Sequence, residues 1–264
     1  MKVESLFVII DPTQRAQPAF NRAVSSAGET GAALHLYACV ATPEAAAEAQ
    51  TLLDSLQREA LGSHAQVTVE LEQGADWAVQ AVAAAKRFGA SMIFKNSFDH
   101  SLVQREREKT SDWTLLRGAP CPVLLVKDFH NWEQRRVLAA INPLSPDADH
   151  ARLNDAIIEF TVNLASGYGS EAHFVTAFSD LNHQPQSAEL ALRCGTPEQQ
   201  IHVRRGKPAE VIRDVGQELN VDLIVVGTVA RDGIKGRVVG NTSERLLDQT
   251  HSDVMVLNLA GRAR

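Results

Sequence analysis

The chain contains two copies of one pattern, and this repetition constrains its fold more than any single motif does. A short apolar run ends at Asp11-Pro12 near the start of the sequence, and a second such run ends at Asn142-Pro143. Gly74 recurs as Gly206. Corresponding positions stay about 132 residues apart from the first predicted strand to the fourth, and chance would not keep that register. The sequence therefore predicts an internal duplication.

Within each copy, apolar runs rich in β-branched residues alternate with helical segments. Such runs are typical of strands that are buried on both faces of a parallel sheet. The predicted strands of the first copy are Leu6–Ile10, Ala33–Val40, Ala65–Leu71, Ser91–Phe94 and Pro122–Val126. Those of the second copy are Val137–Ile141, His173–Phe178, Ile201–Val203, Leu223–Val226 and Val254–Leu257. The predicted fold class is α/β, with two tandem Rossmann-like domains, each an open parallel five-stranded sheet covered by helices on both faces.

Three helices have clear limits in the sequence. One is expected within Gln17–Gly31, one is opened by Thr42-Pro43 and ends near Gly62, and one spans Leu153–Leu164. The boundary between the copies falls in Asp128–Gln134, so the domains are predicted at residues 1–130 and 135–264. This connector is too short for independent tumbling, and we expect the two domains to pack together as a pseudo-dimer.

Composition excludes several classes of protein. The net charge of −6 is mildly acidic, and Lys and Arg are scattered, which argues against a nucleic-acid surface. No apolar run reaches the length of a membrane span, and the first apolar segment is too short for a signal peptide. The cysteines are three in number and show no metal-ligand or redox spacing, which favours a reduced compartment. We expect the protein to be cytoplasmic.

The second copy carries a glycine-bearing loop between a strand and a helix. The strand ends at Gly227, the loop runs to Gly240, and Thr242-Ser243-Glu244 opens the next helix. Glycines let backbone N–H groups approach an anion, and the positive end of a helix favours negative charge, so this arrangement is suited to phosphate. A βα unit needs glycine turns and polar caps in any case, so the loop on its own is equally well explained by architecture.

The spacing of this loop resembles the phosphate loop of the universal stress protein family. Its Gly227, Gly240 and Thr242 match the family pattern, while Ala230 and Asn241 depart from it. Tandem members of the bacterial E-type class are also similar in carrying an Asp-Pro pair after the first strand, a TDWxLLR stretch and a GTVGR…GNTAE sequence. The matching segments here are Asp11-Pro12, Ser111–Arg117 and Gly227–Glu244, and the resemblance covers nearly the whole chain.

In nucleotide-binding relatives this loop holds the triphosphate and ribose, and an Asp after the first strand contacts the adenosine portion. The resemblance therefore implies an adenine-nucleotide-type fold and one candidate ATP site in the second domain. Its residues are Asn142, Gly227, Thr228, Arg231, Gly240, Asn241, Thr242 and Ser243. It also implies dimer-like packing of the two domains, and further pairing into a homodimer is an open alternative.

The first copy keeps Asp11 but is predicted to have lost the phosphate loop. Aligning the copies on a spacing of about 132 residues places Lys95 opposite Gly227, Phe98 opposite Ala230 and Glu108 opposite Gly240. A side chain at each glycine position would block close approach of the backbone, and Glu108 would repel an anion. We therefore expect Asp11 to belong to a degenerate site that binds no nucleotide.

No catalytic constellation is visible in the sequence. The nine histidines form no metal-ligand spacing, and no nucleophile elbow, Walker loop or adenylyl-transfer motif is present. Two hypotheses remain. The first is a non-catalytic, nucleotide-independent module that binds an unidentified protein or a small apolar ligand in stress response, with no certain cofactor and no metal. The second is an ATP-binding switch in the second domain, with or without slow hydrolysis.

Two connections are shorter than is usual for the family. They are Thr42–His64 and Ser179–Gln200, which join the second and third strands of each copy. Either these loops are trimmed, or residues are missing from the sequence.

Overall fold

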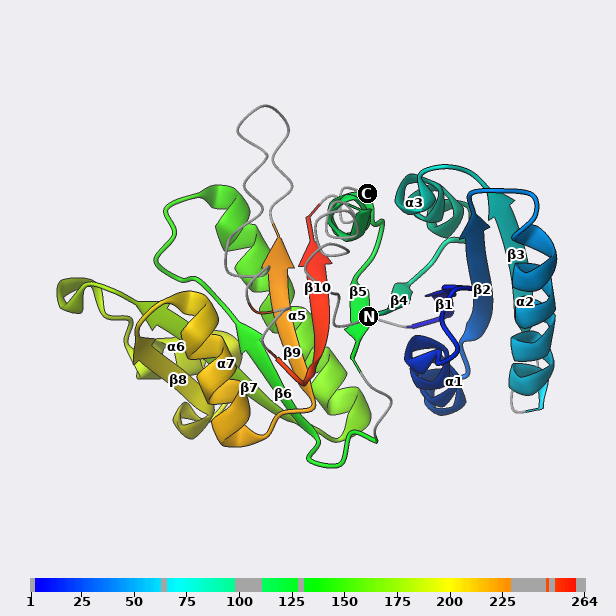
Figure 1. Ribbon diagram of the computed structural model, residues 1–264. Coiled ribbons are helices and arrows are strands. Elements are labelled where there is room, and N and C mark those ends of the chain that lie inside the picture. Colours follow the sequence, from blue (N-terminus) through cyan, green and yellow to red (C-terminus); the bar gives the residue numbers. More distant parts are fainter. Residues whose placement is uncertain are drawn as a thin grey trace. The chain divides into compact units, whose positions relative to one another are not determined.

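The computed structural model (Figure 1) describes residues 3–62, 66–97, 111–127, 131–228, 246 and 250–259. The chain divides into two compact units, with the division at residues 129 and 130. The first unit contains the amino-terminal copy and the second contains the carboxy-terminal copy, and each is an α/β domain.

The first domain has five parallel strands in the order β3-β2-β1-β4-β5. They are β1 (Ser5–Ile9), β2 (Ala33–Val40), β3 (Val67–Gln73), β4 (Met92–Asn96) and β5 (Val123–Val126). Helix α1 (Pro18–Thr30) packs on β1 and β4, and α2 (Ala46–Leu61) packs on β2 and β3. Helix α3 (Trp77–Phe88) packs on β1 and β2, and residues 111–118 are also helical.

The second domain has the same order, β8-β7-β6-β9-β10, again with parallel pairing throughout. Its strands are β6 (Arg136–Ala140), β7 (Glu171–Phe178), β8 (Ile201–Arg205), β9 (Leu223–Thr228) and β10 (Asp253–Asn258). Its helices are α5 (Ala148–Tyr168), α6 (Ser187–Cys194) and α7 (Pro208–Leu219), with 3₁₀ turns η1 (Leu181–His183) and η2 (Glu198–Gln200). The predicted fold class is confirmed.

Helix limits follow capping chemistry more than apolar periodicity. Helix α5 begins at Ala148, earlier than the predicted Leu153, because the Asp147 carboxylate caps it by accepting a hydrogen bond from the Asp149 N–H. Helix α2 begins at Ala46, later than the predicted start at Thr42-Pro43. Gly31, Gly89 and Gly169 end α1, α3 and α5 in the left-handed conformation, which glycine adopts without strain.

Strand pairing corrects the predicted alignment of the two domains by one residue. Leu6 pairs with Met92 in the first domain, and its counterpart Val137 pairs with Leu223 in the second. Continuing along both strands places Asn96, and not Lys95, opposite Gly227. Because successive side chains of a strand point to opposite faces, this single step moves the predicted replacement to the other side of the sheet.

Candidate functional site

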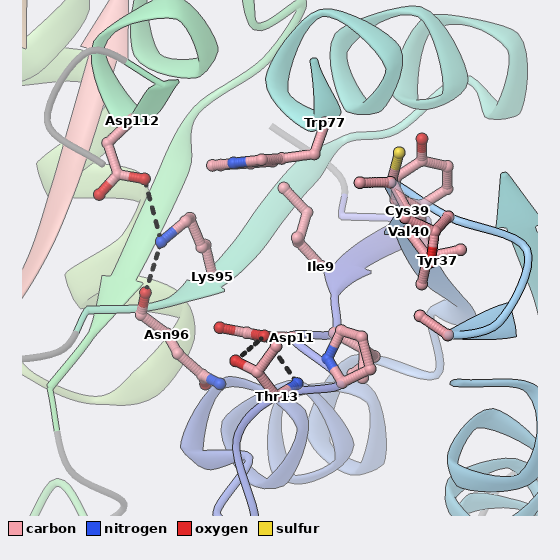
Figure 2. Close-up of a pocket in the computed structure, with 15 residues that line it drawn as sticks. Ile9, Asp11, Thr13, Tyr37, Cys39, Val40, Trp77, Lys95, Asn96 and Asp112 are labelled. Atoms are coloured by element: carbon pink, nitrogen blue, oxygen red, sulfur yellow. Dashed lines mark hydrogen bonds and ion pairs between the residues drawn. The ribbon is translucent and has the colours of Figure 1, made fainter. Parts of the chain in front are cut away.

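The first domain contains a cavity of about 450 Å³ at the carboxyl ends of β1, β2 and β4 (Figure 2). The chain continues from β1 to β2 on one side of the sheet and from β4 to β5 on the other side. Open α/β sheets bind ligands in the crevice at the carboxyl ends of two such neighbouring strands. The apolar lining is formed by Ile9, Ile10, Pro12, Val40, Ala41 and Trp77. The polar lining includes Asp11, Thr13, Cys39, Lys95, Asn96 and Asp112.

Asp11 is held at the floor of this cavity by the turn that follows β1. Its Oδ1 accepts hydrogen bonds from the Thr13 N–H at 2.9 Å and the Thr13 hydroxyl at 2.7 Å. The Gln17 amide donates to the Asp11 carbonyl at 2.7 Å, so the backbone of the turn is also fixed. Pro12 is an ordinary residue for such a turn because its φ is already restricted. The sequence prediction that Asp11 lies at this edge is therefore correct.

Lys95, near the end of β4, lines the cavity, and its positive charge is balanced by the carboxylate of Asp112. Its ammonium lies 3.0 Å from Asp112 Oδ1 and donates to the Asn96 carbonyl at 2.9 Å. The same ammonium lies 5.4 Å from the centre of the Trp77 ring, in cation–π range (Figure 2). Lys95 thus contacts a carboxylate, a carbonyl and an aromatic ring, and its charge is not available to a phosphate unless these contacts are broken.

Asn96, the last residue of β4, connects this strand to the start of α1 through hydrogen bonds. It is buried, its Oδ1 accepts from the Ala19 N–H at 2.7 Å, and its amide donates to Gln17 Oε1 at 2.9 Å. The Ala19 N–H is one of the unpaired donors of the first turn of α1, so Asn96 satisfies a helix end from a distant strand. A side chain does occupy the position of the family's first glycine, as the sequence predicts, but it is Asn96 that fills it and not Lys95.

The wall formed by β2 carries two groups that stay protonated. Burial raises the pKa of the Cys39 thiol, which donates a hydrogen bond to Gln80 Oε1 at 2.7 Å. Burial also raises the pKa of the Tyr37 phenol, which donates to Glu72 at 2.7 Å. Neither group is an activated nucleophile, since that role requires a lowered pKa or an adjacent base.

Trp77 is the main residue of this site to which the sequence analysis gives no role. It is the first residue of α3, it lines the cavity and it is only partly buried. The sequence analysis places Lys95 opposite Gly227 and includes Asp112 in the family-like stretch Ser111–Arg117, but it does not predict their ion pair. Only the strand register and the helix at 111–118 bring the two residues together.

In the second domain, two of the predicted nucleotide residues are fixed by their own neighbours. Asn154 of α5 accepts a hydrogen bond from the Asn142 N–H at 2.9 Å and donates to the Asn142 carbonyl at 2.8 Å. Gly227 lies directly beneath Leu153, because a Cβ added to Gly227 would be 2.6 Å from the Leu153 side chain. This glycine is therefore required by helix packing alone.

The remaining predicted loop residues are only partly covered by the structure. Thr228 is buried at the end of β9. Arg231, Gly240, Asn241, Thr242 and Ser243 lie outside the described residues. Among the residues that are described, no group of three or more His, Cys, Asp or Glu side chains is placed to hold a metal ion. No helix in the described ranges is long and apolar enough to cross a membrane.

Two histidines from adjacent strands meet in the second domain, which their separation in the sequence does not predict. The rings of His173 and His202 stack with 5.4 Å between centroids, and His173 Nδ1 lies 3.2 Å from His202 Nε2. Glu171 lies 3.5 Å from the other nitrogen of His173 and is paired with Arg136. Burial lowers the pKa of both histidines, and each also lies near an arginine.

The stability of the second domain is expected to fall as the pH is lowered through the range in which histidine titrates. The pKa of both histidines is lower in the folded state than the ordinary 6.5, so the unfolded chain binds more protons in this range. The stabilisation is complete above about pH 6.5 and is lost as the pH falls through the folded-state pKa. Thermal unfolding between pH 8 and 5 measures this dependence. His202→Gln should flatten it, whereas an unchanged slope would contradict it.

Comparison with known proteins shows the family of the chain. The Universal stress protein family matches residues 3–127 and 147–258, one match in each domain. The chain therefore belongs to the universal stress protein family, as a member with two tandem domains.

Several known proteins match this chain over nearly their full length. Universal stress protein E of Escherichia coli K12 is 29% identical over 301 aligned positions, covering 96% of this chain and 93% of the relative. Universal stress protein E homolog of Haemophilus influenzae is 25% identical and covers 97% of each. A functionally unknown protein from Pseudomonas aeruginosa PAO1 has a solved structure with a TM-score of 0.78 at 28% identity, over 98% of this chain and 93% of that one. A universal stress protein from Archaeoglobus fulgidus, at 16% identity and a TM-score of 0.77 with 97% of both chains covered, shares the fold.

Proposed function

We propose that this chain is a non-catalytic, cytoplasmic stress-response protein that acts by binding a small molecule in the first-domain cavity. The observation that carries the proposal is the cavity itself. It is formed at the ligand-binding edge of the sheet, and its polar groups are held in place by other residues of the protein: Asp11 by Thr13, and Lys95 by Asp112. A prearranged site of this kind loses little entropy on binding.

The absence of catalysis is supported by the state of the groups around the cavity. The Cys39 thiol and Tyr37 phenol have a raised pKa, and the Lys95 ammonium is paired. Proton transfer or nucleophilic attack needs a group whose pKa lies near the working pH or a base adjacent to the nucleophile. The Cys39 thiol and the Tyr37 phenol do not meet this requirement. Binding, with the signal passed on by a change in contacts, fits these residues better than turnover does.

Filling the cavity is expected to abolish binding without unfolding the domain. Ala41 lines the cavity and is exposed, so the large ring of Ala41→Trp can enter the space at little cost to the core. Native mass spectrometry of the purified full-length chain measures any retained molecule, and hydrogen exchange checks the fold. Ala188→Trp, the same change at an exposed alanine of α6, is the matched control. Equal retention by both variants would place the ligand elsewhere and contradict the proposal.

A second function, an ATP-binding switch in the second domain, is favoured by the loop that begins at Gly227. Asn142 lies at the end of β6 with its backbone fixed by Asn154, where the family contacts the adenosine portion. The packing of Leu153 against Gly227 weakens this hypothesis, since it explains the glycine without a nucleotide. ATP binding, with or without slow hydrolysis, thus depends on the residues from Arg231 to Ser243.

Gly240→Glu is expected to abolish ATP binding if the second domain is the switch. The added carboxylate would repel the triphosphate and prevent close approach of the backbone. Isothermal titration calorimetry with Mg-ATP on the full chain measures the affinity. Gly167→Glu is the control for an added charge, since Gly167 is exposed on α5 and a Cβ there meets nothing within 4 Å. An affinity that does not change in Gly240→Glu would exclude the switch.

A further inference from the structure

We infer that the first-domain cavity selects a small organic cation, an amine carried on an aromatic or aliphatic body, and rejects phosphate compounds. This inference rests on the proposed function, because it names the chemical class of the ligand that the cavity would bind. It is carried by the charges of the lining, by the partners of those charges, and by the apolar surface between them.

The described lining of the cavity has an excess of one negative charge. Asp11, Asp112 and Lys95 are its charged residues, and the last two form an ion pair at 3.0 Å. Asp11 therefore remains uncompensated within this lining. Its Oδ1 is used by the two Thr13 donors, and the structure gives no hydrogen bond to its second oxygen among the described residues. A carboxylate in this position accepts a charge-assisted hydrogen bond from an ammonium group.

The same residues disfavour the binding of an anion. To bind phosphate, Lys95 would have to leave Asp112, and the freed carboxylate would then face the incoming charge. The backbone approach used by a phosphate loop is also closed, because the buried Asn96 side chain occupies the position that corresponds to Gly227. Both features disfavour an anion, and the first of them directly favours a cation.

The apolar part of the cavity fits the body of such a ligand. Ile9, Ile10, Pro12, Val40 and Ala41 line the cavity, and Trp77 faces it from α3 (Figure 2). An aromatic ring can pack against the indole, and an ammonium can lie over its face, as that of Lys95 already does. The volume of about 450 Å³ accommodates a molecule of one or two rings.

Three indoles of nearly equal shape test the charge requirement. They are tryptamine, a cation at neutral pH; tryptophol, which is neutral; and indole-3-acetate, an anion. Saturation-transfer NMR of the full-length chain ranks their affinities at low and at high salt. Tryptamine is expected to bind about tenfold more tightly than indole-3-acetate, the size of one charge-assisted contact, with tryptophol between them. The preference should shrink as salt rises, because this edge of the cavity is open to solvent.

Two isosteric variants assign the preference to particular charges. Asp11→Asn keeps the acceptor for Thr13 but removes the charge, so the advantage of tryptamine should disappear. Asp112→Asn releases Lys95, so indole-3-acetate should then bind at least as well as tryptamine. Asp214→Asn, on the exposed face of α7 in the other domain, is the control and should change nothing.

The outcomes separate this inference from the proposed function. If all three indoles bind equally, or the anion binds best, the cavity is a ligand site but the charge requirement is wrong. A preference that survives Asp11→Asn would also overturn it. If none of the three binds at millimolar concentration, and Ala41→Trp does not alter what the purified protein retains, both the inference and the proposed function fail.

Discussion

Gly227→Ala is expected to destabilise the second domain by about 1–3 kcal/mol, the usual cost of overpacking a filled core. The new methyl group would lie 2.6 Å from Leu153 Cγ and Cδ2. Leu153 is buried on α5, so it cannot swing into solvent, and either the helix or the strand must shift. Since Gly227 does not have a positive φ, the penalty arises from packing and not from backbone strain.

The experiment separates packing from nucleotide binding because no ligand is added. Denaturant unfolding gives the total loss, and hydrogen exchange assigns it to one domain, which is necessary because a two-domain chain need not unfold in one step. Leu153→Ala should remove most of the penalty when it is combined with Gly227→Ala, giving a clear coupling energy. Gly167→Ala is the control, since a Cβ there meets nothing within 4 Å. If Gly227→Ala is as stable as the parent, the packing argument is wrong.

Asn96→Ala is expected to destabilise the first domain by at least about 2 kcal/mol, since each orphaned buried polar group costs about 1–3 kcal/mol. The change leaves the Ala19 N–H without its acceptor and Gln17 Oε1 without its donor, and it opens a space beneath α1. It also removes the connection between the end of β4 and the start of α1. Loss of hydrogen-exchange protection should therefore begin in the first turns of α1.

A matched change at Asn182, which is exposed in η1, should have little effect on stability. Asn96→Gly tests the equivalence of the two positions. If a glycine at this position were enough to let α1 pack on β4 as α5 packs on β9, Asn96→Gly would be as stable as the parent. We expect it to be less stable than Asn96→Ala, because glycine adds flexibility to the unfolded chain. Equal stability of Asn96→Gly and the parent would contradict the role given to Asn96.

The fold was predictable because most strands contain a short apolar run and the two copies agree. Strand β2 was predicted at its observed limits, and the alternation of strands with helices defines the parallel sheet. The register in which β4 pairs with β1 could not be predicted from the sequence. Lys95 and Asn96 are neighbours, both are polar, and both end the same strand, so sequence alone does not decide which one faces α1. Only the pairing of Leu6 with Met92 resolves it.

The candidate site was predictable only in part, and for a physical reason. Asp11 follows a strand, so its place at the sheet edge is determined by topology. Trp77, Lys95 and Asp112 belong to a helix start, a strand end and a second helix, and their meeting depends on how far each element extends past the sheet. The stacking of His173 on His202 depends in the same way on the pairing of β7 with β8.

The different residues at Asn96 and Gly227 limit how the duplicated halves can change in evolution. In one half a polar side chain reaches from the strand to the helix, and in the other an apolar side chain reaches from the helix to the strand. Converting either arrangement into the other requires changes on two elements, and the first change alone would be destabilising. Single substitutions are therefore not expected to make the two domains alike at this position.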